Sequence, residues 1–309
     1  MKRTLLGIAT LAVAVISVNA PAGQEQGVTM RYRLDEGQVL VYKATTERLE
    51  ETETRNRNGK TVRSESASWE EVVFSVTADK ATAGGSTPVT IEILDIKLRR
   101  STDDGDTRRT TEADAQGAKI YEGNKLVEGG KWGEIQLPDG LDLRAPLAAR
   151  IKADISERGV LSGFDQSAEP PPPMQDAAVM ILLFYQPHFP VPPIVKGTSW
   201  TEGSGPVGPG TLTAVAAVKH LGRDCLKLNV GSDSDTTGDD GTKIEYHTSG
   251  TAIVDFATGV LFSYTDRGRE KIRGGPRHED TEIKTTTTIS YTGGKELYDQ
   301  YKAKRASQG

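Results

Sequence analysis

The sequence predicts a mostly β protein made of curved antiparallel sheet, as one open half-barrel or as two β lobes, with one short embedded helix. Runs of alternating apolar and polar residues recur along the chain, a pattern typical of strands with one buried face. An Asn-Gly pair at residues 58–59 separates two such runs, which favours a β-hairpin. One segment, residues 174–185, has the apolar spacing of an amphipathic helix.

The first predicted hairpin joins residues 40–55 to residues 60–78. Near its open end, Val72, Phe74 and Val76 share one face of the second strand. Toward the turn, residues 45–66 are mostly Thr, Glu, Arg and Ser on both faces. Since this tip has little apolar surface to bury, we expect it to extend past the core as a two-stranded arm.

The next run, residues 89–98, changes its hydrophobic phase. Ile91 and Ile93 share one parity, whereas Ile96 and Leu98 share the other. One extra residue in the strand, a β-bulge, would keep both sets on the core face. A strand buried on both sides would give the same pattern, so both interpretations stay open.

Further strands follow at shorter spacing. We expect a charged, flexible stretch at residues 101–116 and a Gly-rich loop at 203–210. The predicted strands are 118–121, 134–137, 151–156, 211–219, 225–230, 243–247, 251–256, 260–271 and 283–291. A short polar helix or a frayed tail is expected beyond Gly294.

Proline and short repeats organise the chain. Four prolines at 170–173 cannot pair as a central strand. The predicted segments are a signal peptide (1–22), an N-terminal β half (23–168), a Pro-rich connector with the helix (169–195), a C-terminal β half (196–294) and a polar tail (295–309). The turns at Gly159 and Gly259 resemble each other, and Gly37 and Gly197 could open the two halves. Their offsets fit a duplication with about 60 extra residues in the first half, and chance similarity of short hairpins is the alternative that stays open.

The composition excludes several classes of protein. The chain has 309 residues, of which 36% are hydrophobic, and a mean hydropathy of −0.46, which indicates a globular protein with a polar surface. One Cys excludes a disulfide framework and a Cys-based zinc site. With 38 Lys and Arg against 43 Asp and Glu and no basic block, nucleic acid is not an expected partner. We expect no cofactor.

The N-terminus has the pattern of an export signal. Lys2 and Arg3 precede an apolar run at residues 5–18, and residues 20–22 (Ala-Pro-Ala) form a cleavage site before Gly23. The run is shorter than the ~20 residues of a spanning helix, which favours a cleaved signal over a retained anchor. We therefore expect a secreted or periplasmic protein with no transmembrane span in the mature chain. Removing Lys2 and Arg3 changes the net charge from −5 to −7.

Three features together resemble a family of uncharacterised bacterial exported proteins. They are the signal peptide, the Pro-rich stretch before residues 195–200 (Val-Lys-Gly-Thr-Ser-Trp) and residues 250–259 (Gly-Thr-Ala-Ile-Val-Asp-Phe-Ala-Thr-Gly). The architecture is also remotely similar to the open half-barrels of LolA- and LppX-type periplasmic lipoprotein carriers. That resemblance implies a curved antiparallel sheet that shelters acyl chains, a binding or structural role, and no catalytic residues. The chain departs from those carriers in its single predicted helix and its long polar hairpins.

An Asp-rich segment is the candidate metal site. Asp233, Asp235 and Asp239 occupy positions 1, 3 and 7 of a calcium-loop template, with a glycine at position 6. Position 12 is Ile244 rather than Glu, and the flanks have strand patterns. A solvated hairpin loop, for which Asp and Gly are suited, therefore competes with a weak Ca²⁺ site.

No pattern of residues predicts an enzyme. None of the four histidines (His188, His220, His247 and His278) lies close enough in sequence to another to form a local metal pair, and we expect structural roles for them. Cys225 lies in a strand pattern without the surroundings of a catalytic thiol. Residues 203–205 (Gly-Ser-Gly) lack the sequence of a nucleophile elbow.

The apolar stripe of the predicted helix carries the remaining functional signal. Met180, Ile181, Phe184 and Tyr185 either fill the concave face as core or line a lipid-sized cavity. We therefore expect an exported, non-enzymatic cell-envelope protein that binds a hydrophobic or lipid-like ligand in a concave β surface. The alternative is a structural or protein-interaction component of the cell surface.

Overall fold

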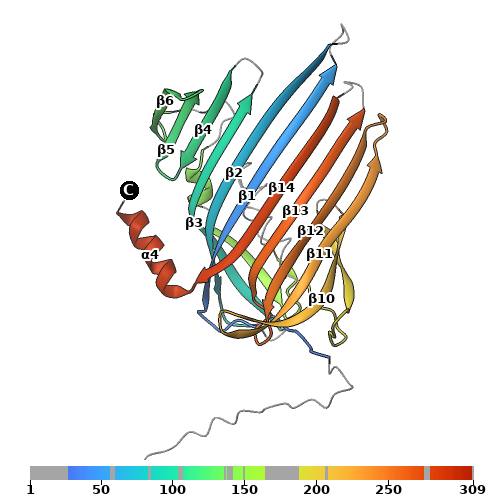
Figure 1. Cartoon of the computed structure of the whole chain (residues 1–309). Helices are drawn as coiled ribbons and strands as arrows, with labels where there is room; N and C mark the ends of the chain where they lie inside the picture. Colours follow the sequence, from blue (N-terminus) through green and yellow to red (C-terminus); the bar gives the residue numbers. More distant parts are fainter. Residues whose placement is uncertain are drawn as a thin grey trace, which may run out of the picture.

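One curved antiparallel sheet of 14 strands dominates the molecule (Figure 1). The computed structural model describes residues 27–55, 60–82, 85–103, 107–135, 137, 142–148, 150–163, 188–205, 208–274 and 279–307. The strands are β1 (Val39–Arg55), β2 (Thr61–Ala78), β3 (Ser86–Asp103), β4 (Arg108–Asp114), β5 (Gly117–Glu122), β6 (Lys125–Lys131), β7 (Arg150–Ser156), β8 (Leu161–Ser162), β9 (Ser199–Gly205), β10 (Gly208–His220), β11 (Arg223–Thr237), β12 (Lys243–Asp255), β13 (Leu261–Gly274) and β14 (Glu279–Gly293). Two helices are described, α1 (Arg144–Ala148) and α4 (Lys295–Ala306).

The strand order shows that the chain forms one open sheet rather than two lobes. The order is β6-β5-β4-β3-β2-β1-β14-β13-β12-β11-β10-β9, and the end strands β6 and β9 are not paired with each other. β1 pairs with β14 from Val41 to Thr54, which joins the two predicted halves within the sheet. On the outer edge of β3, residues 86–92 pair with β7 and residues 97–103 pair with β4. The predicted fold class, mostly β with an open curved sheet, is confirmed.

The phase change in β3 comes from a β-bulge, as one of the two interpretations predicted. The register between β2 and β3 shifts at Val73/Phe74, so Ile93 and Ile96 both face the main core. Leu94 faces the other side of the sheet. There α4 covers it with Leu297, Tyr298 and Tyr301, together with the buried Val41 and Val73. Burial on both faces therefore also holds locally, because the expected C-terminal helix packs on the outer face of the sheet.

Several local predictions are wrong. Residues 45–66 are not a free arm, because β1 and β2 pair along their length with β14 and β3 as well as with each other. The stretch 101–116 contains the strand β4, and the Gly-rich segment 203–210 lies largely in β9 and β10. Among the described residues near 134–137, pairing is limited to an isolated bridge at Ile135. The polar composition of residues 45–66, 101–116 and 203–210 indicated segments outside the sheet. In the structure, neighbouring strands satisfy the backbone hydrogen bonds of the strands in these segments.

Two turns at the start of β1 and β9 share one hydrogen-bond pattern. The Gly37 N–H donates to the Ala78 carbonyl, and the Ala78 N–H donates to the Gln38 carbonyl. At the second site, the Gly197 N–H donates to the Ala214 carbonyl, and the Ala214 N–H donates to the Thr198 carbonyl. The bond lengths are 2.8 and 2.9 Å at the first site and 2.7 and 2.9 Å at the second. Both glycines have positive φ, which explains why glycine stands at each turn.

The two hairpins at Gly159 and Gly259 occupy corresponding places in the strand order but differ in their turns. Gly159 donates to the Ser156 carbonyl, three residues back, and Gly259 to the Asp255 carbonyl, four residues back, each at 2.9 Å. The sheet neighbours β8-β7-β3-β2-β1 match β13-β12-β11-β10-β9 in order, and β4 to β6 with α1 lie between β3 and β7 as additional residues. The strand order is compatible with a duplication that has extra residues in its first half, and the duplication stays a prediction.

Some predictions fall outside the described residues. They are the signal peptide, the prolines at 170–173 and the helix at 174–185. Within the described part of the chain, no helix is long and apolar enough to cross a membrane.

Candidate ligand-binding face

Alternate residues of the long strands form horizontal rows on the inner face of the sheet. One row, which we name the apolar row, crosses seven neighbouring strands, and its members are 3% exposed or less. The register places these residues side by side: Val72, Ala44, Ile289, Tyr264, Ala252, Leu228 and Ala214. Because strand residues two apart share a face, the next row up is two positions farther along each strand.

That next row, which we name the polar row, differs sharply in chemistry. Its polar members are Glu70, Thr46, Thr287 and Asp266, from β2, β1, β14 and β13, and Gly250, Val230 and Leu212 continue it on β12, β11 and β10. Thr287 and Asp266 are buried at its centre. On β2, β1, β14 and β13, the inner face therefore passes from apolar to polar within one step of the sheet pleat.

Asp266 is the outstanding group of the polar row. Asp266 is 7% exposed, and its Oδ1 has no hydrogen-bond partner among the described residues. Burial raises the pKa of Asp266 to about 6, an effect that the Arg267 N–H and His247 offset only in part. A buried acceptor without a donor is costly, so such a group marks a candidate binding position.

Glycine on the neighbouring strand makes room for this carboxyl group. A Cβ added at Gly250 would lie 2.3 Å from the Thr265 carbonyl oxygen and 3.1 Å from Asp266 Oδ1. Any side chain at 250 would therefore displace the backbone of β13 or the carboxyl group. Gly250 fixes the close approach of β12 to β13 beside Asp266.

An aromatic ladder lies at the bottom of the inner face. Tyr42 stacks on Phe74 with ring centroids 5.3 Å apart and meets Tyr291 edge-on at 6.0 Å, and Tyr291 lies 5.4 Å from Phe262. These four rings come from four adjacent strands. The Tyr42 hydroxyl has no partner among the described residues, and burial, with smaller effects from Tyr32 and Tyr291, raises its pKa. Met30 and Phe189 pack into the same core.

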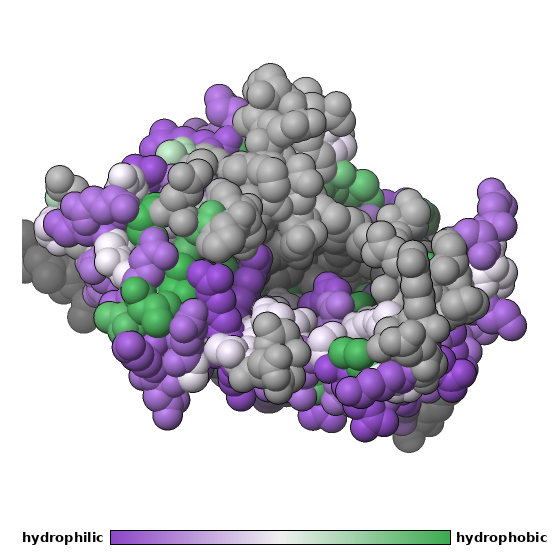
Figure 2. All heavy atoms as spheres, turned by 90° about the horizontal axis from the view of Figure 1, so that it is seen from above, coloured by the Kyte–Doolittle hydropathy of each residue, from purple (hydrophilic) through white to green (hydrophobic). Residues whose placement is uncertain are grey.

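The inner side of the molecule is open to view from the strand ends. Figure 2 shows a hollow in the middle of the molecule, bordered by pale and purple residues of intermediate and hydrophilic character. An apolar floor below a band of hydroxyl and carboxyl groups suits an amphiphile, whose apolar part and polar group need different surroundings.

The predicted ligand-binding residues cannot be placed on this face. Met180, Ile181, Phe184 and Tyr185 lie outside the described residues. Asp266 carried a signal that the sequence reasoning missed. It shares strand parity with Phe262 and Tyr264, so an acid stands on the apolar face of the run.

The Asp-rich segment is mostly strand rather than loop. Asp233 and Asp235 lie in β11, and Asp239 lies in the turn that follows. Asp233 pairs with His247 Nδ1 on β12, and both side chains are largely exposed. Among the described residues, no group of three or more His, Cys, Asp or Glu side chains is arranged to hold a metal ion. The proposed Ca²⁺ ligands are therefore spread along a strand and its turn.

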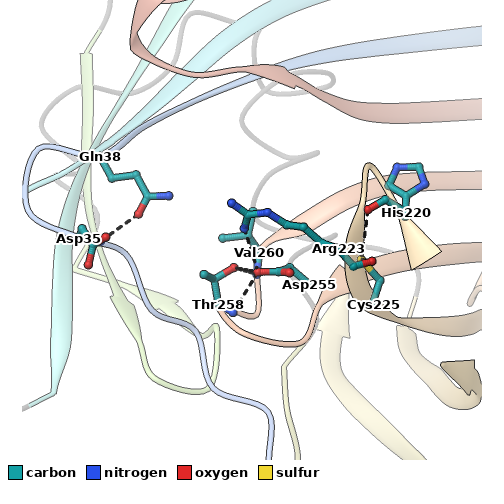
Figure 3. A network of polar contacts seen from close by, with 8 residues as sticks. All are labelled: Asp35, Gln38, His220, Arg223, Cys225, Asp255, Thr258 and Val260. Carbon is teal, nitrogen blue, oxygen red and sulfur yellow. Dashed lines mark hydrogen bonds and ion pairs between the residues drawn. The ribbon is translucent and has the colours of Figure 1, made fainter. Parts of the chain in front are cut away.

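A second buried acid, Asp255, has a structural role. Figure 3 shows Thr258 and Arg223 pointing toward its carboxyl group. Asp255 Oδ2 accepts hydrogen bonds from Thr258 N at 3.1 Å and Thr258 Oγ1 at 2.5 Å, and Arg223 Nη1 lies 3.3 Å away. These contacts join the β12–β13 turn to the β10–β11 turn.

Cys225 lies beside this network and is not an activated thiol. Its Sγ lies 3.7 Å from the Arg223 carbonyl oxygen. Burial, with the negative charge of Asp255, raises the pKa of Cys225. The His220 ring packs near Phe262 at 6.1 Å. Burial lowers the pKa of His188, and the positive charge of Arg158 adds to this effect. His188 also interacts with a neighbouring group.

No family model and no curated protein matches the chain. Among solved structures, it is similar to lipovitellin, in a structure described by its lipid–protein interactions, with 10% identity and a TM-score of 0.47. That match covers 85% of this chain and 26% of lipovitellin, so the chain spans about a quarter of that protein's length.

Two bacterial proteins are similar at lower scores. The translocator domain of the autotransporter NalP from Neisseria meningitidis matches with 7% identity and a TM-score of 0.22, over 84% of this chain and 90% of that chain. An outer membrane channel from Pseudomonas putida F1 matches with 7% identity and a TM-score of 0.21, over 84% and 97%. All three TM-scores lie below 0.5, so none supports an inference about this chain, and the resemblance to exported carriers stays an expectation.

Proposed function

We propose that this chain is an exported, non-enzymatic cell-envelope protein that binds an amphiphilic, lipid-like ligand on the inner face of its sheet. The observation that carries the proposal is Asp266, a buried carboxyl group with an unpaired oxygen in the polar row. The apolar row lies directly beneath it. Export rests on the sequence pattern of residues 1–22.

The chemistry of the rows defines the ligand class. The polar group of the ligand would carry a hydroxyl or amine that donates to Asp266 Oδ1, because a buried acceptor is satisfied only by a donor. The hydroxyl groups of Thr46 and Thr287 lie in the same row and can donate or accept. The apolar part would extend over aliphatic and aromatic side chains of the inner face.

Native mass spectrometry of protein exported by a bacterial host and purified without detergent tests this proposal. We expect a mass excess that organic extraction removes, and displacement of a bound fluorescent fatty alcohol by the extract. Asp266→Asn should reduce the mass excess, because it replaces one accepting carboxylate oxygen with an amide NH2 group that only donates. Asp299→Asn is the matched control, since Asp299 is an exposed acid on α4 that pairs with Lys295.

Two outcomes would contradict the proposal. A protein that has a bare monomer mass and does not bind the fluorescent fatty alcohol would exclude an amphiphile site. A bare dimer mass would favour the alternative, a structural or protein-interaction component, with contact through the free strand edges.

A further inference from the structure

The outer face of the sheet carries a cleft that is separate from the inner face. Its volume is about 1000 Å³, and it lies between β2–β3 and the β4–β6 segment. An adjoining cleft of about 430 Å³ extends over β1 and β14, and Trp69 and Arg99 line both. We name the pair the Trp69 cleft. Its combined size suits a ligand several rings long.

Glycine backbone makes one wall of the Trp69 cleft. Gly117, Gly129 and Gly130 of β5 and β6 line it without side chains. A Cβ at Gly117 would lie 2.1 Å from the Gly130 carbonyl oxygen, so the close approach of β5 to β6 requires glycine. The wall therefore presents backbone to the cleft, and the half-buried Trp69 on β2 lines the same cleft.

The charges around Trp69 are mainly positive. Seven Lys and Arg side chains line the Trp69 cleft, against four Asp and Glu, on a chain whose net charge is −5. Among the described residues, Lys119, Lys131 and Arg108 have no ion-pair partner, although Arg108 donates to Ser101 Oγ at 3.1 Å. Arg99 meets Glu112 only at 3.7 Å. These cations are available for an anionic ligand.

We propose that the Trp69 cleft binds an acidic oligosaccharide, a chain of sugar rings that carry carboxylates. The C–H face of a sugar ring stacks on an indole ring, and the carboxylates pair with Lys119, Lys131 and Arg108. An acidic peptide of equal charge lacks the C–H ring faces that each sugar unit can stack on Trp69. This site is independent of the inner face, so it stands or falls apart from the proposed function.

Calorimetric titration with a short oligogalacturonate tests the site, with a malto-oligosaccharide of equal length as the neutral control. We expect binding of the acidic sugar only, weakened by raising the salt concentration because salt screens exposed charges. Trp69→Ala should weaken binding about tenfold, and Lys119→Ala or Arg108→Ala about threefold each. Lys152→Ala, an exposed lysine on β7, is the matched control and should leave binding unchanged.

Thermal unfolding of each variant accompanies the titrations. If Trp69→Ala does not fold, Trp69→Phe and Lys119→Ala decide the question, because the first keeps a ring and the second changes only an exposed side chain. The proposal is overturned if oligogalacturonate does not bind, or if its affinity for Lys119→Ala and for a folded Trp69→Ala equals its affinity for the unchanged protein. Equal binding of the neutral sugar, or equal binding of polyglutamate, also overturns it.

Discussion

Asp266 is an acidic residue whose burial changes its ionisation and therefore the pH dependence of stability. A carboxyl group with a pKa of about 6 binds its proton more tightly in the folded chain than in the unfolded chain. Below about pH 4 both states are protonated, and the group costs little. As the pH rises from about 4 to 6, the unfolded state ionises first, so the folded state loses stability. Above that window the loss is complete.

Asp266→Asn should therefore stabilise the protein at pH 8 by about 1–2 kcal/mol and leave its stability nearly unchanged at pH 4. The amide cannot ionise, so it avoids the cost of a buried charge. Urea unfolding at the two pH values measures the difference. An equal gain at both pH values, or a loss at pH 8, would show that the carboxylate is well solvated or paired.

Single residues were predicted from sequence where their neighbours lie close in the chain. The glycines at 159 and 259 were placed correctly in turns, because a turn depends on local backbone conformation. The unpaired state of Asp266 and the position of Trp69 beside β5 and β6 depend on strands distant in sequence. Strand parity with Phe262 and Tyr264 was the one local signal that could have placed Asp266 on the inner face.

At the scale of elements, turns at the lower end of the sheet are fixed by both backbone conformation and packing. Gly259 has φ +68°, and a Cβ there would lie 2.7 Å from the Arg31 carbonyl oxygen and 2.9 Å from Phe189. Gly197 has φ +84° but nothing within 4 Å of an added Cβ. Comparing alanine substitutions at the two turns therefore separates the energetic cost of backbone strain from that of steric contact.

Gly259→Ala should lower the free energy of unfolding by about 3 kcal/mol or more, because backbone strain adds to the clash with Arg31. Gly197→Ala should cost about 1 kcal/mol, from the backbone conformation alone. Guanidinium unfolding of the two variants gives the comparison. Equal costs would mean that the segment at Arg31 moves away without loss.

At the scale of the whole molecule, the sheet is continuous across the two halves of the chain. The pairing of β1 with β14 and one main hydrophobic cluster connect the N-terminal and C-terminal strands. A folding unit bounded near residue 196 would break both. Both halves run through their strands in the same order, but because they share one sheet we expect the whole sheet to be the unit of stability.

Calorimetry should show one cooperative unfolding transition rather than two. Leu228→Ala, in the C-terminal strands of the apolar row, should lower the midpoint of that single transition because it leaves a cavity that costs about 3 kcal/mol. Two separate transitions, only one of them shifted by the variant, would show that the halves unfold independently.

The sequence by itself determined most of the long strands and the turn glycines, because alternation and positive φ act over a few residues, and it left the bulge in β3 as one of two interpretations. It also indicated the open antiparallel class. Only the tertiary structure decided that β1 pairs with β14, that β4 and the upper parts of β1 and β2 belong to the sheet, and that Asp266 and Trp69 lie at opposite faces. Polar strands have no local hydrophobic signal, so their place is set by the neighbours that complete their hydrogen bonds.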